Sequence, residues 1–505
     1  MKSKTQKIGL LTATSLVVGN MIGVGIFVLP AVLSNYGSVS LLGWLFTATG
    51  ALILAKIFSN FSKIIVSKSG GPYVYSKAGF GDFIGFLVAW GYWIACWVGN
   101  GAIAIAIIGA ASFFIPELTT NSILSVSLGL ALIWIFTWIN ARGIKESGKI
   151  QLITTIFKIL PLLFVIVIGL FFFEFDNFPA FNLIGESNFS AISAVATLTL
   201  YAFLGIECAT IPAGNIENPD KTIPRATMLG TIIVTILYIL GTVVLFGILP
   251  LDILQNSPAP FAEAAKIIGG TYGGYFVAVG VLISGIGVLN GWILITGQIS
   301  MATAKDDLFP DFFKKENKNG APVNGFIVGG VLSSIVMLMN YTEGLVEQFE
   351  FIVQLTVLVI LMPYLFTAAS YALIVIEKKL HTKSWIKTFI LSALGFAYSL
   401  WAIYGSGYET VFYGFLLILI GIPVYIYMKW IKNKEKSLHT SVIPPFQHSI
   451  IPSFHHSNIP SFHHSIIPSF HHSIIPSFHY SIIPSFHHSI IPSFHHSIIP
   501  SFHHS

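Results

Sequence analysis

The stretch Gly19-Asn20-Met21-Ile22-Gly23-Val24-Gly25 interrupts the first apolar segment of the chain, and Phe203-Leu204-Gly205-Ile206-Glu207 interrupts the sixth. Inside a bilayer an unpaired backbone group costs several kcal/mol, so unwound chain survives only where it lines a protected cavity. Interruptions at corresponding places in two halves of a helical membrane protein indicate a transporter's binding site. The two breaks therefore predict a transporter whose site lies between them.

The composition is that of a polytopic membrane protein. Charged residues make up 9% of the sequence, against about 25% in soluble domains, and hydrophobic residues make up 54%. Several stretches reach the roughly 20 apolar residues that cross a bilayer, and no cleavable signal peptide is evident. We therefore predict an all-α protein of about twelve transmembrane helices. The predicted spans are approximately residues 9–34, 39–64, 82–113, 121–140, 149–173, 191–214, 226–249, 271–301, 324–340, 348–376, 386–404 and 410–430.

The basic residues predict the orientation of these spans. With a cytoplasmic N-terminus, every Lys and Arg falls on the cytoplasmic side except Lys56, Lys158 and Lys266. Lys56 and Lys158 lie within spans, from which a long side chain can snorkel to the interface. The positive-inside rule then places both termini in the cytoplasm. The net charge of +5 reflects this topology and gives no reason to expect a nucleic acid as partner.

The C-terminal part of the chain differs from the rest. From His448 to Ser505 the sequence repeats His-Ser-Ile-Ile-Pro-Ser-Phe-His, without Lys, Arg, Asp or Glu. A proline every eighth residue forbids a continuous helix, and such a stretch has no core of its own. We therefore expect a permease domain at residues 1–436 and a disordered low-complexity tail at residues 437–505.

The histidines of the tail admit two interpretations. Composition alone would allow a metal-binding tract. However, adjacent histidines lack the ligand spacing of a preformed site, which favours a translated nucleotide repeat without a role. The two cysteines, Cys96 and Cys208, lie inside spans and suggest neither a disulfide nor a zinc site. No metal and no cofactor are expected.

The two breaks differ in the chemistry that they offer. Backbone amides near Gly23, Val24 and Gly25 would begin a second half-helix and suit a carboxylate, unless the glycines only permit close helix packing. In the sixth span, the carbonyl end of the broken helix would suit an amino group. Glu207 is the only carboxylate deep in any predicted span, so it is a candidate proton carrier or gate, with a structural acid as the alternative.

Other spans contribute polar and aromatic candidates. Tyr92, Cys96 and Asn100 are spaced by four and share one helical face, and Asn100 needs a polar partner at that depth. Trp292 follows a glycine in the eighth span. A tryptophan face binds cationic groups when it is desolvated, and the alternative is that Trp292 only fills space between helices. Thr356 and Tyr364 mark the tenth span.

Taken together, these motifs resemble the amino acid–polyamine–organocation (APC) transporter superfamily, and within it the bacterial basic amino acid/polyamine antiporters that include the arginine/agmatine exchangers. The resemblance covers about residues 8–430. The motifs that carry it are Gly19-Asn20, Gly23-Val24-Gly25, the run from Tyr92 to Asn100, Phe203-Leu204-Gly205-Ile206-Glu207, Asn218-Pro219, Ile223-Pro224-Arg225, Gly291-Trp292, Gly297-Gln298 and Ala304-Lys305-Asp306-Asp307.

The resemblance implies a LeuT-like core of two inverted five-helix repeats with helices one and six broken, and two peripheral helices. It also implies roles for the candidate residues. The substrate carboxylate would meet Gly23, Val24 and Gly25. The amino group would meet Ile22 and the carbonyls near Tyr201 and Leu204. The cationic side chain would meet Trp292, with Ala95, Cys96, Asn100 and Thr356 around its polar end. The inner gate would consist of Tyr92, Glu207 and Tyr364, and Tyr201 would form an outer gate.

Three positions depart from the arginine exchangers. Val24 stands where they have serine, Tyr201 where they have a tryptophan gate, and Ile103 where they have methionine.

The leading hypothesis is a secondary active exchanger of a cationic amino acid such as arginine. It would work by alternating access in a bacterial inner membrane, against an amino acid or its decarboxylated amine. A neutral amino acid permease is the alternative. The spans contain no histidine for an enzyme, and the asymmetric breaks disfavour a channel. A homodimer is left open.

Overall fold

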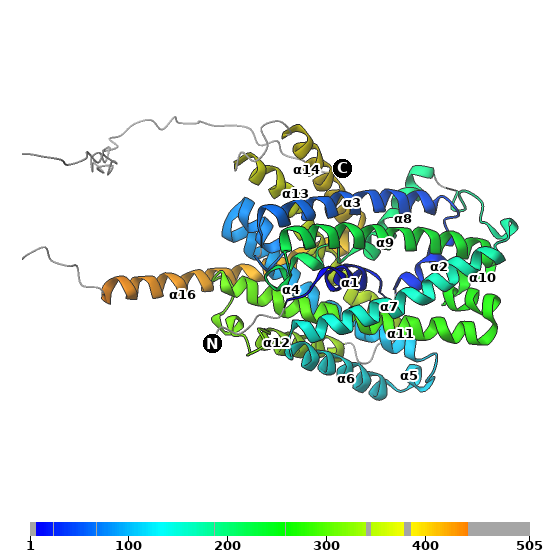
Figure 1. The fold of residues 1–505 in the computed structure, drawn as a ribbon, viewed down its shortest axis with the longest axis horizontal. Coiled ribbons are helices and arrows are strands. Elements are labelled where there is room, and N and C mark those ends of the chain that lie inside the picture. The colour runs from blue at the N-terminus through cyan, green and yellow to red at the C-terminus, as the bar shows by residue number, and fades with distance from the viewer. Residues whose placement is uncertain are drawn as a thin grey trace, which may run out of the picture. The chain divides into compact units, whose positions relative to one another are not determined.

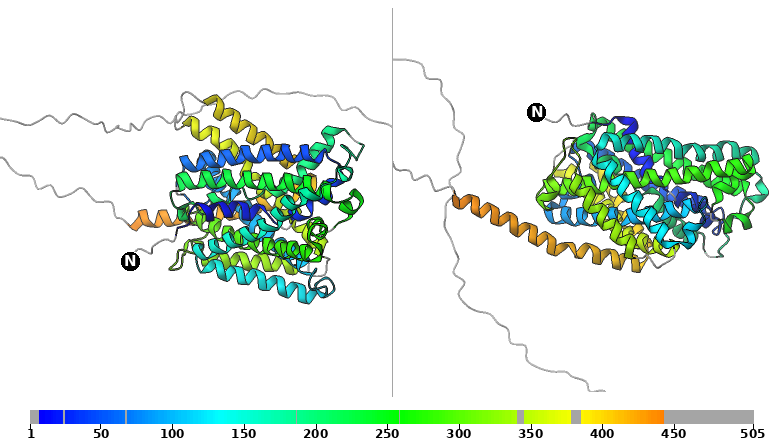
Figure 2. Two further views of the ribbon diagram at one scale, coloured as in Figure 1. Left: turned by 45° about the vertical axis from the view of Figure 1, so that its right-hand side comes forward. Right: turned by 90° about the horizontal axis from the view of Figure 1, so that it is seen from below.

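The computed structural model describes residues 7–442, except residues 24, 67, 186, 258, 340–344 and 378–384. Within these ranges the regular secondary structure is helical, apart from one isolated β-bridge between Ile8 and Ile216. The long helices run side by side, except that α16 projects beyond the others (Figures 1 and 2). They are α3 (Ser40–Ile64), α4 (Pro72–Ala111), α6 (Ser122–Ala141), α7 (Ile144–Gly169), α9 (Pro219–Ile248), α11 (Pro260–Lys305), α12 (Val323–Met339), α13 (Leu345–Glu377), α14 (Trp385–Gly405) and α16 (Gly421–Val442).

Shorter elements connect or complete these helices. The short α-helices are α1 (Leu10–Met21), α2 (Leu29–Ser34), α5 (Glu117–Thr120), α8 (Asn188–Leu200), α10 (Leu251–Asn256) and α15 (Tyr408–Leu419). The 3₁₀ helices are η1 (Gly25–Phe27), η2 (Leu170–Phe172), η3 (Phe175–Asn177), η4 (Tyr201–Phe203), η5 (Cys208–Thr210), η6 (Ala213–Asn215) and η7 (Asp311–Lys314).

The spans agree with the sequence pattern. Among the described residues, ten helical segments are long and apolar enough to cross a membrane, and α1 and α12 are shorter apolar helices. The spans predicted to begin at residues 82 and 271 follow kinks at Gly81 (φ 79°) and Gly270 (φ 61°) inside α4 and α11. Because a positive φ is easily adopted only by glycine, the helix can change direction at these two residues. Each kink separates a short preceding helix from the membrane-spanning helix that follows it.

The first predicted break is present. Helix α1 ends at Met21, Ile22 is extended (φ −78°, ψ 91°), and the helical path resumes in η1 and α2. Val24 lies outside the described residues. Because the chain leaves the helix here, backbone groups of this segment become available to partners other than their own helix.

The sixth segment is broken more deeply than the sequence suggested. After α8 and η4, Leu204 is extended (φ −66°, ψ 133°) and Gly205 has a φ of 110°. The remainder of the segment, expected to be helical to residue 214, consists of the 3₁₀ turns η5 and η6. Pro212 has no N–H to continue an α-helix, and Thr210 donates to the carbonyl of Glu207 from both its amide (2.7 Å) and its hydroxyl (2.6 Å).

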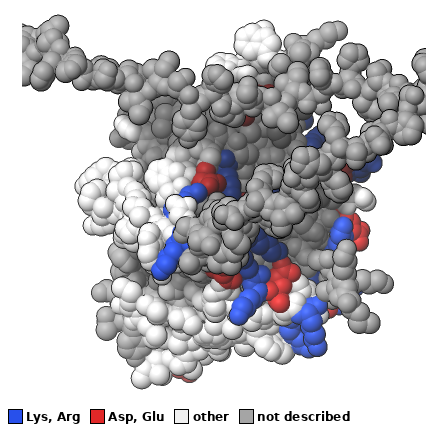
Figure 3. Space-filling model, turned by 90° about the vertical axis from the view of Figure 1, so that its left-hand side faces the viewer, with Lys and Arg blue, Asp and Glu red and all other residues white. Residues whose placement is uncertain are grey.

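The two breaks lie against each other. A Cβ atom on Gly205 would stand 3.2 Å from the Cβ of Asn20, so the glycine permits this approach. Helix α1 also packs against α7, α9 and α11. At one end of these helices, Lys, Arg, Asp and Glu side chains gather on the surface (Figure 3). We call this surface the charged end; it includes Lys77, Asp306 and Lys314.

Helix α16 continues to Val442, past the domain boundary expected at residue 436. The octapeptide repeat and its histidines lie outside the described residues. The division into a permease domain and a disordered tail stays a prediction.

Candidate functional site

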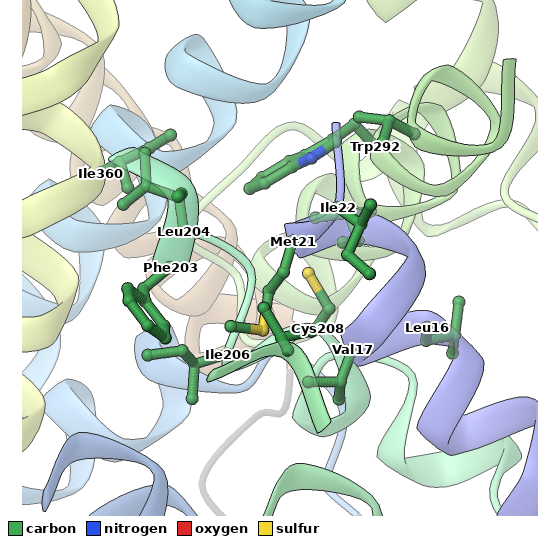
Figure 4. Packing of buried hydrophobic residues seen from close by; sticks show 14 of the residues in the cluster. Leu16, Val17, Met21, Ile22, Phe203, Leu204, Ile206, Cys208, Trp292 and Ile360 are labelled. Carbon is green, nitrogen blue, oxygen red and sulfur yellow. The ribbon is translucent and has the colours of Figure 1, made fainter. Parts of the chain in front are cut away.

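A pocket with a cavity volume of about 80 Å³ lies between the two breaks. Seven of the predicted site residues line it: Gly23, Gly25, Ala95, Cys96, Tyr201, Leu204 and Trp292. The indole of Trp292 points from α11 toward the side of the sixth segment that carries Leu204, above Met21 and Ile22 (Figure 4). The glycine breaks and the aromatic candidate therefore meet at one site.

The first break presents an amide to this pocket. The amide of Gly23 donates to the carbonyl of Met21 (3.0 Å). No acceptor for the amide of Gly25 is found among the residues that the structure describes, and Gly25 lines the pocket. An unpaired N–H beside an apolar cavity suits an anionic ligand group such as a carboxylate.

The carbonyl of Ile22, expected to meet a substrate amino group, accepts two hydrogen bonds within the protein. The donors are Nζ of Lys158 on α7 (2.8 Å) and Oγ of Ser284 on α11 (2.9 Å). Lys158 also donates to the carbonyls of Gly19 (2.8 Å) and Ser284 (3.2 Å). Its three N–H donors therefore have three acceptors, which makes the burial of an ammonium tolerable.

The expectation that Lys158 snorkels to the interface is wrong, because its side chain is fully buried. Sequence reasoning missed its role since the acceptors are main-chain carbonyls from two other segments, and such partners leave no mark in the sequence. Lys56, by contrast, is exposed, as snorkelling requires.

The three predicted gate residues form one hydrogen-bonded cluster. Tyr92 and Tyr364 donate to the two carboxylate oxygens of Glu207. The amide of Gly205 donates to the Tyr364 hydroxyl (3.2 Å). All three gate side chains are at most 1% exposed, so the cluster closes the protein at this level.

The pocket extends from this closure away from the charged end. Tyr92 lies under Trp292, with ring centroids 6.2 Å apart. Along α4 the pocket then follows Cys96, Gly99, Ile103 and Ala106, and a second hollow continues from Ala106 to Phe113. Access is therefore from the end of the protein opposite the charged end.

Two further predicted residues lie outside the pocket lining. Asn100 is buried and donates to Oγ1 of Thr296 (3.3 Å), and its own Oδ1 has no partner among the described residues. Thr356 belongs to α13, but its side chain lies outside the described residues.

A buried amide cluster beside the first break was not predicted. Asn20 accepts from Nε2 of Gln151 (3.4 Å), and Asn290 donates to Oε1 of Gln151 (3.2 Å). These residues lie on α1, α7 and α11. The sequence could have indicated this cluster, because each of these amides lies in an apolar span and needs a polar partner there, as Asn100 does.

The fold matches a known transporter architecture. A solved structure of MhsT in complex with L-phenylalanine superposes with a TM-score of 0.56 over 81% of this chain and 100% of that chain, at 14% sequence identity. The protein thus has a LeuT-like fold, and the predicted architecture with broken first and sixth helices is confirmed. Residues 8–431 match the amino acid permease family, so the chain belongs to this family within the APC superfamily and not to a family of enzymes.

Several bacterial relatives are similar over most of their length. The arginine/ornithine antiporter of Pseudomonas aeruginosa is 31% identical, covering 84% of this chain and 91% of that protein. The putrescine transporter PotE of Haemophilus influenzae is 33% identical, covering 86% and 100%. The arginine/agmatine antiporter of Chlamydia pneumoniae is 32% identical, covering 84% and 91%.

Proposed function

We propose that this permease exchanges a cationic amino acid, such as arginine, by alternating access, with another amino acid or the decarboxylated amine as its counter-substrate. The names of the relatives support this class, since they carry arginine, ornithine, agmatine or putrescine. The observation that carries the proposal is the indole of Trp292, which borders the pocket between the Gly25 amide and the gate.

The pocket can hold both ends of such a substrate. The amide of Gly25, for which no acceptor is found among the described residues, suits the carboxylate. The indole face of Trp292 attracts a cation, by about 2 kcal/mol where the site is desolvated. Both residues line the same cavity, so one molecule can reach them together.

Alternating access follows from the closure described above. The pocket reaches one end of the protein and is sealed from the charged end by Glu207 and its two tyrosines. Release toward the charged end requires these hydrogen bonds to open. If only the loaded carrier rearranges, influx of one substrate requires efflux of another, which is exchange.

Proteoliposomes test this proposal directly. Labelled arginine should enter vesicles loaded with arginine or agmatine much faster than empty vesicles. Equal uptake into both would contradict exchange, and no uptake or competition by arginine would contradict the cationic substrate.

A neutral amino acid permease is the second candidate, and one observation favours it. No carboxylate is found among the described residues that line the pocket, and both oxygens of the nearby Glu207 accept hydrogen bonds from tyrosines. A competition panel of neutral and cationic amino acids and their amines against one labelled substrate separates the two candidates.

We further propose a bacterial inner membrane location with both termini, and hence the charged end, in the cytoplasm. A cysteine replacing Ser3 should react with an impermeant reagent only from the cytoplasmic side, and one replacing the exposed Ser187 only from the outside. The reverse pattern would invert the orientation. Pairing into a homodimer stays a prediction, which the mass of the purified complex would test.

A further inference from the structure

A second hollow, away from the substrate pocket, lies between α3, α13 and α14. Three lysines border it, Lys56 and Lys63 on α3 and Lys387 on α14. None of the described residues that line it is acidic. A cavity framed by three ammonium groups attracts an anion.

These lysines differ from Lys68, Lys77 and Lys314 at the charged end, which form ion pairs. There, Lys68 and Lys77 pair with Asp306, and Lys314 pairs with Asp307 and Asp311. No ion pair of Lys56, Lys63 or Lys387 is found among the residues that the structure describes, and all three are exposed. Their charge is therefore available to a ligand.

The floor of the hollow adds a hydrogen-bond donor. Tyr371 lines it, is 5% exposed, and accepts a hydrogen bond from Nδ2 of Asn60 (2.9 Å). No acceptor for the hydroxyl hydrogen of Tyr371 is found within the described part of the chain. This hydrogen can therefore be donated to a ligand oxygen, as phosphate oxygens require.

The position of the hollow indicates whether its anion is a lipid headgroup or a free ion. Lys56 and Lys63 are seven residues apart, roughly 10 Å along α3, and Lys63 lies in the last turn of this span. Beside the hollow, α14 exposes an apolar face of Ile386, Phe389 and Ile390, each more than half exposed. In a membrane protein this face meets acyl chains, while the lysines lie where headgroups begin.

The geometry points to a site for an anionic phospholipid, whose phosphate is held by Lys56, Lys63, Lys387 and the Tyr371 hydroxyl while its acyl chains lie along α14. A phosphate ester supplies the acceptor oxygens, and its negative charge offsets the three ammonium groups. The site is separate from the substrate pocket and does not depend on which amino acid is transported.

Native mass spectrometry of the purified full-length protein tests the site. Lipid-free protein in detergent is titrated with phosphatidylglycerol, or with phosphatidylcholine of the same acyl chains. Wild type should retain phosphatidylglycerol preferentially. The variant Lys56→Gln/Lys63→Gln/Lys387→Gln should lose this retention by about tenfold or more. The matched control Lys145→Gln/Lys221→Gln/Lys315→Gln changes the charge equally at exposed lysines outside the hollow and should behave as wild type.

Each other outcome is decisive. Equal loss in the control variant, or retention of phosphatidylcholine as strong as that of phosphatidylglycerol, would overturn the site. Binding of inorganic phosphate without any preference for phosphatidylglycerol over phosphatidylcholine would assign the hollow to free phosphate and overturn the lipid. If the triple variant does not fold, Tyr371→Phe keeps every charge and should still weaken retention several-fold, and unchanged retention in Tyr371→Phe would then contradict the proposal.

Discussion

The ammonium nitrogen of Lys158 lies 2.8 Å from the carbonyl oxygen of Gly19, in the last turn of α1 before the first break. The same nitrogen contacts the carbonyls of Ile22 and Ser284, so a cation carried by α7 joins the break to α11. Unwound carbonyls in transporters of this architecture coordinate cations. Here an ammonium group of the chain itself contacts carbonyls at the break.

Lys158→Met removes this cation and keeps most of its volume. The buried carbonyl of Gly19 then loses its donor, at a cost of about 1–3 kcal/mol, while the carbonyl of Ile22 keeps the hydrogen bond from Oγ of Ser284. We expect a lower melting temperature and an exchange rate reduced at least about tenfold. Lys266→Met, at an exposed lysine, is the control. A melting temperature and exchange rate equal to those of wild type would show that the ammonium is dispensable.

Tyr364→Phe should loosen the closure toward the charged end. It removes one donor to Glu207 and the acceptor of the Gly205 amide, together worth about 1–3 kcal/mol. The population should shift toward a state open at the charged end. Cys208, fully buried beside Glu207, then reports the change, and its reaction with a thiol reagent from that end should rise about tenfold.

A matched variant separates this effect from a general loss of stability. Tyr398→Phe also removes a buried hydroxyl. This hydroxyl donates to the carbonyl of Thr47 (3.4 Å) and makes no hydrogen bond to the gate residues. Its Cys208 labelling should equal that of wild type. If both tyrosine variants label alike, the hydrogen bond to Glu207 does not control the closure.

Trp292→Leu should weaken binding of a cationic substrate without unfolding the protein. The indole is 7% exposed and lines the pocket, so its loss removes a desolvated cation site worth about 2 kcal/mol, or roughly thirtyfold in affinity. Trp134→Leu, at a tryptophan that is 40% exposed on α6, is the control. Isothermal titration with arginine measures both, and equal affinities in the two variants would remove Trp292 from the site.

Gly291→Ala should destabilise the contact between α11 and α1. A Cβ atom there would stand 1.8 Å from Oδ1 of Asn20, so either the Asn20 side chain must leave the buried amide cluster or the helices must move apart. Overpacking of this kind costs about 1–3 kcal/mol. At Gly109, in α4, an added Cβ meets nothing within 4 Å, so Gly109→Ala should melt at or above the temperature of wild type. Similar melting of the two variants would show that the contact relaxes freely.

Local chemistry made much of this fold predictable. Glycines at the two breaks and at Gly81 and Gly270 mark the ends of helices because of their backbone freedom, and apolar runs mark the spans. The site was predictable where one residue type carries the chemistry, as for Trp292. Features that depend on main-chain atoms far away in the sequence could not be predicted. The carbonyl partners of Lys158 and the 3₁₀ turns after Glu207 arise only when several segments pack together.

At the charged end, Asp306 joins α11 to the chain around α4. Its Oδ2 accepts from the Tyr73 hydroxyl (2.8 Å) and lies 3.2 Å from Nζ of both Lys68 and Lys77. Burial acts to raise the pKa of the Asp306 carboxyl. The hydrogen bond from Tyr73 and the charges of Lys77 and Lys68 outweigh it, so this pKa lies below its ordinary value.

Asp306→Asn should therefore destabilise the protein in a pH-dependent way. A lowered folded-state pKa means that the carboxylate stabilises the folded state above its ordinary pKa of about 4, and that this contribution is lost as pH falls through the lowered value. The melting difference between wild type and Asp306→Asn should be constant from about pH 8 to pH 5 and shrink below about pH 4. Partly exposed pairs contribute about 0–1 kcal/mol each and weaken with salt. Asp176→Asn, at an exposed carboxylate, is the control, and a difference that grows on acidification would reverse the assigned sign.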